Sequence, residues 1–255
     1  MRAVILAAGI SSRLRPLTDT MPKCLLTLGG KTILGRMLEN LSRHGITDLV
    51  MVTGYRERQI KTFVSDHFSR LKVAFVTNDR YQSTNNSYSL WLTHDQIRQD
   101  EILLLDSDIV FDRRIIDLLL GARHENCLAV KKGDRLGAEE IKVRLGADGS
   151  IEEIGKEVNP ERAAGESIGI EKFGQEFVGE LLKVLERKML IDKSVNQFYE
   201  AAFQEAIEGG HPMAAVDAGA LQCIEIDTAA DLAAAEDVIT ALQGPPRRRG
   251  GPARR

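Results

Sequence analysis

Cysteine, aromatic residues and long apolar runs are all scarce in this sequence of 255 residues. Its three cysteines, Cys24, Cys127 and Cys223, lie far apart and lack the spacing of a zinc site, which favours reduced, buried thiols in a cytoplasmic protein. No apolar stretch approaches the roughly 20 residues of a membrane-spanning helix, so we expect no span. The net charge of −3 gives the folded part no reason to bind nucleic acid.

An apolar run, a few small residues and a basic loop open the chain. Residues 3–6 predict a buried strand, and the small residues after it let a ligand approach the backbone. Exposed amides, two serine hydroxyls and three cations (Arg13, Arg15 and Lys23) suit a polyanion. We therefore predict a nucleoside triphosphate site. Its expected nucleotide-binding residues are Leu6, Ala7, Ala8, Gly9, Ser11, Ser12, Arg13 and Lys23.

The spacing of this loop argues against two other phosphate-binding motifs. A dinucleotide fingerprint, GxGxxG, needs three glycines where this loop has only Gly9. A Walker loop, GxxxxGK[ST], is also absent. The remaining alternative is a strand followed by an ordinary basic surface loop.

Beyond the loop, apolar periodicity predicts helices and strands in alternation. Thr32 can cap a helix that ends near Gly45. Strands are expected at residues 49–52 and 73–76, with a helix at 57–67 between them. This alternation is typical of an α/β fold with three αβα layers and a mixed, mostly parallel sheet.

Short strands and turns after Cys127 interrupt that alternation. Ile141, Val143 and Leu145 alternate with charged residues, and glycines mark turns, so we expect a small antiparallel subdomain beside the main sheet. We expect residues 1–243 to form a single domain. Residues 244–255 contain five arginines and predict a disordered tail. RNA binding by this tail is the alternative, but we expect its charges to be solvated.

Polar side chains follow two of the predicted strands. Asp106 and Asp108 come at the end of the strand expected at 101–105, where buried carboxylates are costly without a cation. A hard divalent ion on a triphosphate would offset that cost, and a pair of helix caps is the alternative. Asn78 and Asn85 follow another strand; their amides suit the edge of a nucleobase, and capping is again the alternative.

Two further groups of candidate site residues, each with at least one acid, lie in the last quarter of the chain. A helix expected at 195–207 carries Phe198, Tyr199 and Glu200, two aromatic rings beside a carboxylate, which could bind an alkylammonium. The alternative is a core stripe of Phe198, Ala202 and Phe203 that leaves Glu200 outside. Glu225 and Asp227, on one face of a strand before a helix capped by Thr228 and Asp231, could reach one ion together.

The motif LAAGISSRLRPLTDTMPK resembles the signature LAAGxGxRLxPLTxxxPK of the sugar-phosphate nucleotidyltransferases, and departs from it at Ser11, where that family usually has glycine. Five further runs extend the resemblance over nearly all of residues 1–242. They are most similar to the CTP:phosphocholine cytidylyltransferase branch, and they read TNNSYSLWL, LLLDSDIVFD, GESIGI, QFYEAAF and IEIDTAADL.

This resemblance implies a nucleotidyltransferase fold whose acceptor-binding part spans about residues 128–220. It implies transfer of CMP from CTP to phosphocholine or a similar phosphorylated acceptor, with release of pyrophosphate and with Mg²⁺ as the cofactor. The implied catalytic residues are Arg13, Lys23 and Lys156, and the metal ligands Asp108, Asp227 and Glu225. Asp106 would lie near the ribose, and the implied acceptor-binding residues are Lys142, Lys156, Glu166, Tyr199 and Glu200.

Other functions stay open within and outside this class. The acceptor could be an aminoalkylphosphonate, an inositol phosphate or a sugar-1-phosphate, with CTP or another NTP as donor. A nucleotide-sensing regulator of the same fold is the alternative that is not an enzyme. A sensor need not keep both metal carboxylates. It is therefore disfavoured by the presence of the full set of Arg13, Lys23, Asp108 and Asp227.

Overall fold

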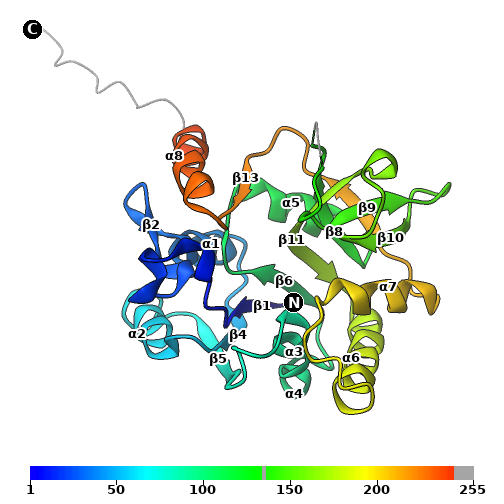
Figure 1. Cartoon of the computed structure of the whole chain (residues 1–255), viewed down its shortest axis with the longest axis horizontal. Helices are drawn as coiled ribbons and strands as arrows, with labels where there is room; N and C mark the ends of the chain where they lie inside the picture. Colours follow the sequence, from blue (N-terminus) through cyan, green and yellow to red (C-terminus); the bar gives the residue numbers. More distant parts are fainter. Residues whose placement is uncertain (134–135, 244–255) are drawn as a thin grey trace, which may run out of the picture.

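Four parallel strands form the centre of the protein, in a computed structural model that describes residues 1–133 and 136–243 (Figure 1). Their order is β5–β4–β1–β6, so the strand that leads into the basic loop lies beside the strand that ends in Asp106. All four predicted strands are confirmed. Their bounds are β1 Arg2–Ala7, β4 Asp48–Thr53, β5 Lys72–Thr77 and β6 Ile102–Asp106.

Antiparallel strands extend this sheet beyond β6. The second half of β11 (Gly165–Phe173) pairs with β6, and its start pairs with β9 (Lys142–Leu145), which pairs with β10 (Ile151–Gly155). β8 (Cys127–Lys131) pairs antiparallel with β11 and parallel with β12 (Ala214–Asp217), which gives this sheet nine strands within the described residues. The predicted antiparallel part therefore exists, but β11 makes it continuous with the main sheet.

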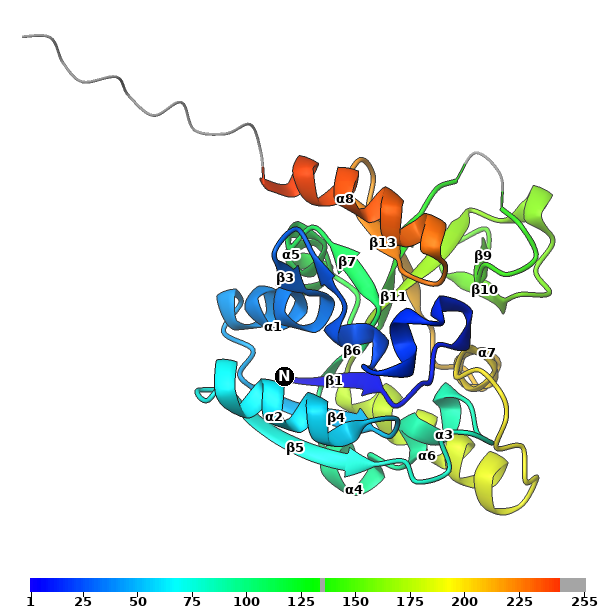
Figure 2. The ribbon, with the colours of Figure 1, turned by 60° about the vertical axis from the view of Figure 1, so that its left-hand side comes forward.

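Helices cover both faces of the sheet, which confirms the three αβα layers (Figures 1 and 2). One apolar cluster joins one face of the sheet to α1, α2 and α5, and a second joins the other face to α3, α4, α6 and α7. The bounds on the first face are α1 Ile33–Arg43, α2 Glu57–His67 and α5 Arg114–Gly121. On the second face they are α3 Asn86–Trp91, α4 His94–Ile97, α6 Gln175–Leu190 and α7 Glu200–Glu208.

A third, smaller apolar cluster holds the C-terminal helix against the N-terminal loop. The helix α8 (Ala229–Gln243) follows β13 (Cys223–Glu225), which pairs antiparallel with β7 (Ile109–Phe111) from the middle of the chain. The loop contains 3-10 turns and a short hairpin. Their bounds are Ser12–Leu14, Leu17–Asp19 and Lys23–Leu25 for the turns, and β2 Thr27–Leu28 and β3 Lys31–Thr32 for the hairpin; a fourth 3-10 turn, Pro160–Arg162, precedes β11.

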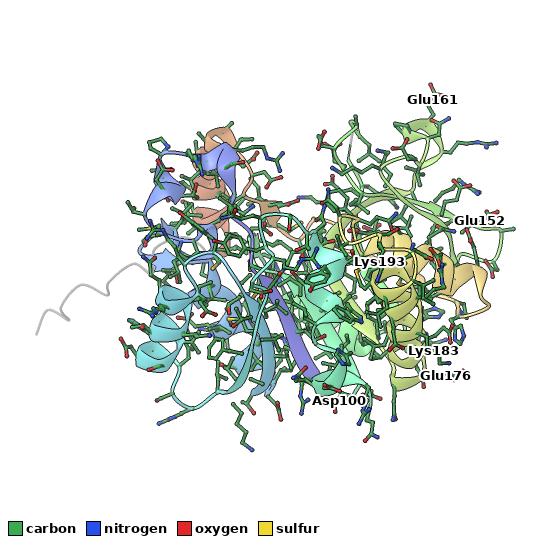
Figure 3. All side chains as sticks on the ribbon, turned by 60° about the horizontal axis from the view of Figure 1, so that its bottom comes forward. Asp100, Glu152, Glu161, Glu176, Lys183 and Lys193 are labelled. Atoms are coloured by element: carbon green, nitrogen blue, oxygen red, sulfur yellow. The ribbon has the colours of Figure 1, made fainter. Side chains whose placement is uncertain are left out.

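Local sequence explains most element boundaries. The Thr32 hydroxyl accepts a hydrogen bond from the Gly35 amide at 2.9 Å and begins α1, and Gly45 follows that helix with a left-handed φ of +72°. On α6, Glu176 and Lys183 are exposed (Figure 3), whereas Phe177, a residue of the same helix, is buried. This alternation gives α6 its apolar face.

The start of α7 differs from the prediction. The helix begins at Glu200 and not at residue 195, because the preceding residues run alongside α3. The Asn85 amide donates to the Val195 carbonyl at 3.0 Å, and the Tyr199 amide donates to the Asn86 side chain at 2.9 Å. These backbone groups are bound by another segment and cannot form helical hydrogen bonds.

The three cysteines are free and buried, as predicted. Across residues 1–133 and 136–243, no helix has both the length and the apolar character needed to cross a bilayer. The arginine-rich segment 244–255 lies outside the described residues, so the expectation of a disordered tail stays a prediction.

Candidate active site

A cleft of about 650 Å³ lies where β1 and β6 end. Three segments that are distant in the sequence line it: the loop after β1, the turn between β6 and β7, and the residues between β13 and α8. The ends of parallel strands are where open α/β sheets bind ligands. The cleft therefore joins the predicted triphosphate loop to the predicted metal carboxylates.

Three carboxylates meet on one side of the cleft. Asp108, Glu225 and Asp227 each offer an oxygen, and these oxygens lie within 4.8 Å of one another. The pairing of β7 with β13 brings them together, because Ile109 lies opposite Glu225 and the Ile226 amide donates to the Asp108 carbonyl at 3.0 Å. The structure thus juxtaposes all three predicted metal ligands.

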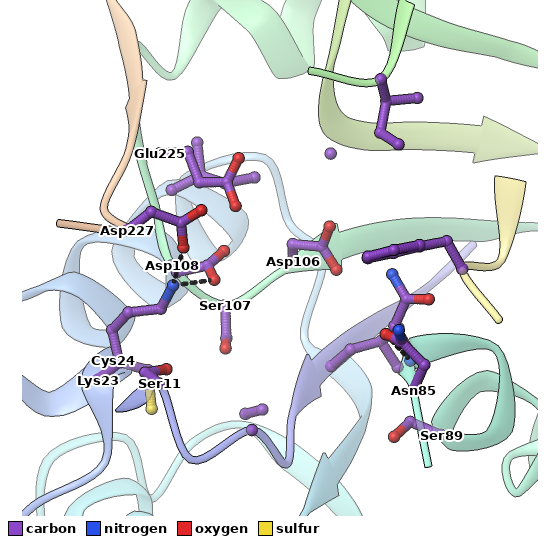
Figure 4. Close-up of a pocket in the computed structure, with 18 of the residues that line it drawn as sticks. Ser11, Lys23, Cys24, Asn85, Ser89, Asp106, Ser107, Asp108, Glu225 and Asp227 are labelled. Atoms are coloured by element: carbon purple, nitrogen blue, oxygen red, sulfur yellow. Dashed lines mark hydrogen bonds and ion pairs between the residues drawn. The ribbon is translucent and has the colours of Figure 1, made fainter. Parts of the chain in front are cut away.

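Two cations from the basic loop contact these carboxylates. The Lys23 ammonium lies 2.6 Å from an oxygen of Asp108 and 2.9 Å from one of Asp227 (Figure 4). The Arg13 guanidinium lies 2.6 Å from the other Asp227 oxygen. Burial lowers the pKa of Lys23, but the charges of Asp108 and Asp227 outweigh burial and raise it overall. Burial likewise opposes the effect of Lys23 and Arg13 on Asp227, whose pKa is lowered overall.

The carboxylate cluster fits a hard divalent cation. Asp108 Oδ1 is buried and has no hydrogen-bond partner among residues 1–133 and 136–243, which is costly for a carboxylate oxygen. Desolvation in the cleft and the charges of Asp108 and Asp227 raise the pKa of Glu225, the most exposed of the three acids. A cation would relieve both conditions, and an all-oxygen donor set is the one that Mg²⁺ prefers.

A second acidic group lies across the cleft, around Asp106 (Figure 4). The Tyr199 hydroxyl donates to Asp106 Oδ2 at 2.8 Å. Burial and the charges of Asp108 and Glu200 raise the pKa of Asp106. Burial also raises the pKa of Glu171, and it raises that of Glu200 to about 7. This side of the cleft therefore concentrates buried acids whose ionised forms are unfavourable without a nearby cation.

Lys156, the residue directly after β10, faces this acidic group. Its ammonium lies 3.0 Å from Glu139 Oε2 and 4.6 Å from the centre of the Phe198 ring. Phe198, one of the two aromatic rings predicted beside Glu200, is 41% exposed and lines the cleft, so it does not join the alternative core stripe. Tyr199, predicted to bind the acceptor, is fully buried and reaches the site only through its hydrogen bond to Asp106.

Not all predicted site residues reach the cleft. Lys142 is 1% exposed, and its ammonium donates to the carbonyls of Gly137 and Glu140 at 2.9 and 3.1 Å. It does not line the cleft, and neither does the exposed Ser12, which begins a 3-10 turn. Lys156 is thus the cleft-lining member of the two lysine candidates. Glu166 lines the cleft.

The two asparagines line the cleft but also have structural partners. The Asn78 amide donates to Thr84 and Ser89 at 3.1 Å each, and its oxygen accepts from the Arg80 amide at 2.9 Å. Asn85 caps α3 by accepting from the Asn86 amide at 2.8 Å. The structural alternative applies to both residues, and their contact with a nucleobase stays a prediction.

The loop residues lie as expected along the cleft. Leu6, Ala7, Ala8, Gly9 and Ser11 all line it. Ser11 takes a left-handed φ of +54°, a conformation that favours glycine. This backbone conformation accounts for the glycine that the resembling family usually has at this position.

Sequence reasoning missed several residues of the cleft. Gly169 on β11 faces Asp106, and Asp231 lies behind Asp227, where its carboxylate accepts from the Asp227 amide at 3.1 Å. The sequence predicted Asp231 only as a partner of Thr228 in a helix cap. Its short spacing from Asp227 was the signal that could have placed it beside the proposed metal ligands. Nothing in the local sequence indicated the role of Gly169.

Comparisons with known proteins agree with this geometry. Residues 3–225 match the family described as MobA-like NTP transferase domain. The CTP:phosphoglutamine cytidylyltransferase of Campylobacter jejuni is 29% identical over 254 residues, which cover 91% of this chain and 98% of that protein. The CMP-5'-(3-aminopropyl)phosphonate synthase of Streptomyces rubellomurinus is 27% identical over 244 residues, which cover 91% of this chain but 37% of that protein.

A solved structure also shares the fold. The CTP:phosphocholine cytidylyltransferase from Streptococcus pneumoniae superposes with a TM-score of 0.78 and 21% identity, and the match covers 94% of this chain and 99% of that one. This likeness confirms the predicted fold class, with its mixed, mainly parallel sheet and its small antiparallel additions.

Proposed function

Because the chain belongs to the MobA-like NTP transferase family, we propose that this nucleotidyltransferase moves CMP from CTP to a small phosphorylated acceptor and releases pyrophosphate. The observation that carries this proposal is the meeting of three distant segments around one cleft. Arg13 and Lys23 come from the first segment, Asp108 from the second and Asp227 from the third. These residues are the cations and carboxylates that a metal-bound triphosphate needs.

In the proposed reaction, an oxygen of the acceptor's phosphate attacks the α-phosphorus of CTP, and the bond from that phosphorus to pyrophosphate breaks. Lys23 and Arg13 would turn from Asp227 toward the triphosphate and offset the charge on the leaving group. Lys156 would orient the attacking phosphate. The chain thus contributes position and charge, without a covalent intermediate.

Magnesium would be held by Asp108 and Asp227, with Glu225 at the open edge, and when bound it would supply Lewis-acid stabilisation of the triphosphate. The unpartnered Asp108 oxygen supports this assignment. Asp106, fixed by Tyr199, lies on the other side of the cleft and would meet the ribose.

We propose phosphocholine or a similar small molecule with a cationic head as the acceptor. The named substrates or products of the three similar proteins, phosphoglutamine, 3-aminopropylphosphonate and phosphocholine, are all small phosphorylated or phosphonylated molecules with a nitrogen-containing end. Glu200 and Glu166, two acids that line the cleft, support a cationic end in this chain as well. Inositol phosphates and sugar-1-phosphates, which carry only hydroxyls, are the alternative acceptors.

The first test measures pyrophosphate release with each of the four NTPs, Mg²⁺ and a panel of phosphorylated acceptors. We expect activity with CTP, and we expect Asp108→Asn and Asp227→Asn each to lower kcat at least about 100-fold, because each removes a charge from the metal site. Asp237→Asn, an exposed change on α8, is the control and should leave kcat unaltered.

Two results would contradict parts of this proposal. Activity with UTP or ATP alone would overturn the choice of CTP but keep the nucleotidyltransferase. Wild-type rates in either active-site variant, with a preserved melting temperature, would remove that aspartate from the metal site. Tight NTP binding without turnover of any acceptor would favour the sensor.

A further inference from the structure

The acceptor half of the cleft contains a buried carboxylate without a partner. Glu200 is the first residue of α7, is 6% exposed and lines the cleft. Its Oε2 atom has no hydrogen-bond partner in the described residues. A buried acceptor oxygen in this state is destabilising until a donor reaches it, so the missing donor is expected to come from a ligand in the cleft.

The surroundings of Glu200 favour a positively charged donor over a neutral one. Asp106 and Glu171 lie close enough that the charge of Glu200 raises the pKa of both. The two cations that act on this group already have partners: Lys156 pairs with Glu139, and Lys23 pairs with Asp108 and Asp227. A hydroxyl or amide would satisfy the oxygen of Glu200 but would not offset the burial and the neighbouring acids that make its ionised form unfavourable.

Few aromatic faces are available to a quaternary ammonium at this place. Among the described residues that line the cleft, Tyr81 and Phe198 are the aromatic ones. The Lys156 ammonium already lies over the Phe198 ring, and Tyr199 is fully buried with its ring against Phe203, at 4.9 Å between centroids. A cage for a trimethylammonium group normally surrounds the ligand with several aromatic faces.

We propose that the acceptor carries a primary ammonium, as in an ω-aminoalkyl phosphate or phosphonate, and that this ammonium donates a hydrogen bond to Glu200. This inference rests on the proposed function, and among acceptors with a cationic head it favours a primary ammonium over the quaternary ammonium of phosphocholine. A primary ammonium combines a full charge with three N–H donors, whereas a trimethylammonium has the charge and no donor. It therefore meets both conditions around Glu200, because it donates to the unpartnered oxygen and its charge stabilises the ionised form of a buried acid.

A series of acceptors that differ only at nitrogen tests the proposal. We would measure pyrophosphate release from Mg-CTP at pH 8 with phosphoethanolamine, its N-methyl and N,N-dimethyl derivatives and phosphocholine, and with 2-hydroxyethyl phosphate as the neutral analogue. The expected kcat/KM falls at each methylation and is at least tenfold lower for phosphocholine and for the hydroxyl analogue than for phosphoethanolamine. Equal or better use of phosphocholine or of the hydroxyl analogue would overturn the proposal.

Glu200→Gln supplies the residue-specific arm of the experiment. This variant keeps the shape of the side chain but removes its charge, so the preference for phosphoethanolamine over phosphocholine should fall to less than threefold. Glu208→Gln, at the exposed end of the same helix, is the matched control and should keep the wild-type preference. An unchanged preference in Glu200→Gln would show that Glu200 does not bind the ammonium.

The outcomes separate this inference from the function on which it rests. If no acceptor releases pyrophosphate with any NTP, the proposed function fails. If CTP is used but the methylation series is flat or reversed, the proposed function stands and the primary ammonium is wrong. The wild-type series gives this answer even if Glu200→Gln does not fold.

Discussion

At the scale of single residues, Gly169 fixes the position of Asp106. Its backbone has a φ of +70°, and a Cβ added there would lie 2.9 Å from both Asp106 Oδ2 and Ile109 Cδ1. A side chain at this position would meet two penalties, a left-handed backbone and a collision with the carboxylate that Tyr199 holds. The close approach of β11 to β6 in the cleft thus depends on a residue without a side chain.

We predict that Gly169→Ala destabilises the protein by about 1–3 kcal/mol and lowers kcat/KM for the nucleotide, because Asp106 must move. Gly179→Ala is the matched control, since Gly179 lies within α6 and an added Cβ meets nothing within 4 Å. That change should stabilise the protein by about 0.5–1 kcal/mol. Chemical denaturation and initial rates measure both; equal effects would show that Gly169 is an ordinary strand residue.

The sequence predicted the residue types of the site better than their orientations. Lys23, Asp108 and Asp227 come together as predicted, because both aspartates follow strands and Lys23 belongs to the loop after β1. Tyr199 is buried, contrary to the prediction, because residues 195–199 bind along α3, more than a hundred residues away in the chain. Such long-range backbone pairing leaves no periodic signal in the local sequence.

At the scale of elements, the start of α8 supports the metal site. One oxygen of Asp231 accepts hydrogen bonds from the amides of Asp227 and Thr228, at 3.1 and 2.7 Å, and from the Thr228 hydroxyl at 2.8 Å. The Asp231 amide donates back to that hydroxyl at 3.2 Å, which completes the predicted capping box. The cap of the helix and the backbone of the metal ligand are therefore one structure.

We expect Asp231→Ala to lower stability by about 1 kcal/mol through loss of the cap and also to raise the Mg²⁺ concentration needed for half-maximal activity, because Asp227 loses its backbone anchor. Asp237→Ala, an exposed change on the same helix, should alter neither quantity. Thermal unfolding and a magnesium titration of the rate provide the two measurements. A lower melting temperature with an unchanged magnesium requirement would limit Asp231 to capping.

Most elements were predictable because their apolar pattern is local. The helices α1, α2 and α6 and the central parallel strands follow their patterns closely. The short strand β7 was not predicted, since Ile109–Phe111 gains its pairing only from β13 near the other end of the chain. The junction made by β11 was also unpredictable in detail, because one strand pairs with β9, β6 and β8 along different parts of its length.

At the scale of the whole molecule, we expect Lys23 to link the proposed binding of magnesium to that of nucleotide. Its ammonium lies against the same two carboxylates that would hold magnesium. A triphosphate that draws Lys23 away frees these oxygens for the metal. Because linkage is reciprocal, magnesium must strengthen the binding of CTP by the same factor by which CTP strengthens the binding of magnesium.

Replacing Lys23 should change the affinities for magnesium and for CTP in opposite directions. In Lys23→Met, we expect magnesium without nucleotide to bind at least about tenfold more tightly, which is about 1.4 kcal/mol, because no ammonium competes for Asp108 and Asp227. The same variant should bind CTP more weakly. Lys183→Met, an exposed change on α6, is the control, and calorimetric titration measures each affinity. Unchanged or weaker magnesium binding in Lys23→Met would disprove the competition.

The pairing of β7 with β13 also determines the stage of translation at which the candidate active site can form. Every strand of the main sheet leaves the ribosome before Asp227 does, so the sheet can begin to fold as a partial chain. Asp108 gains its partner strand only when residues 223–227 follow. A growing chain therefore presents the basic loop and one aspartate, and it completes the proposed magnesium site only late in translation.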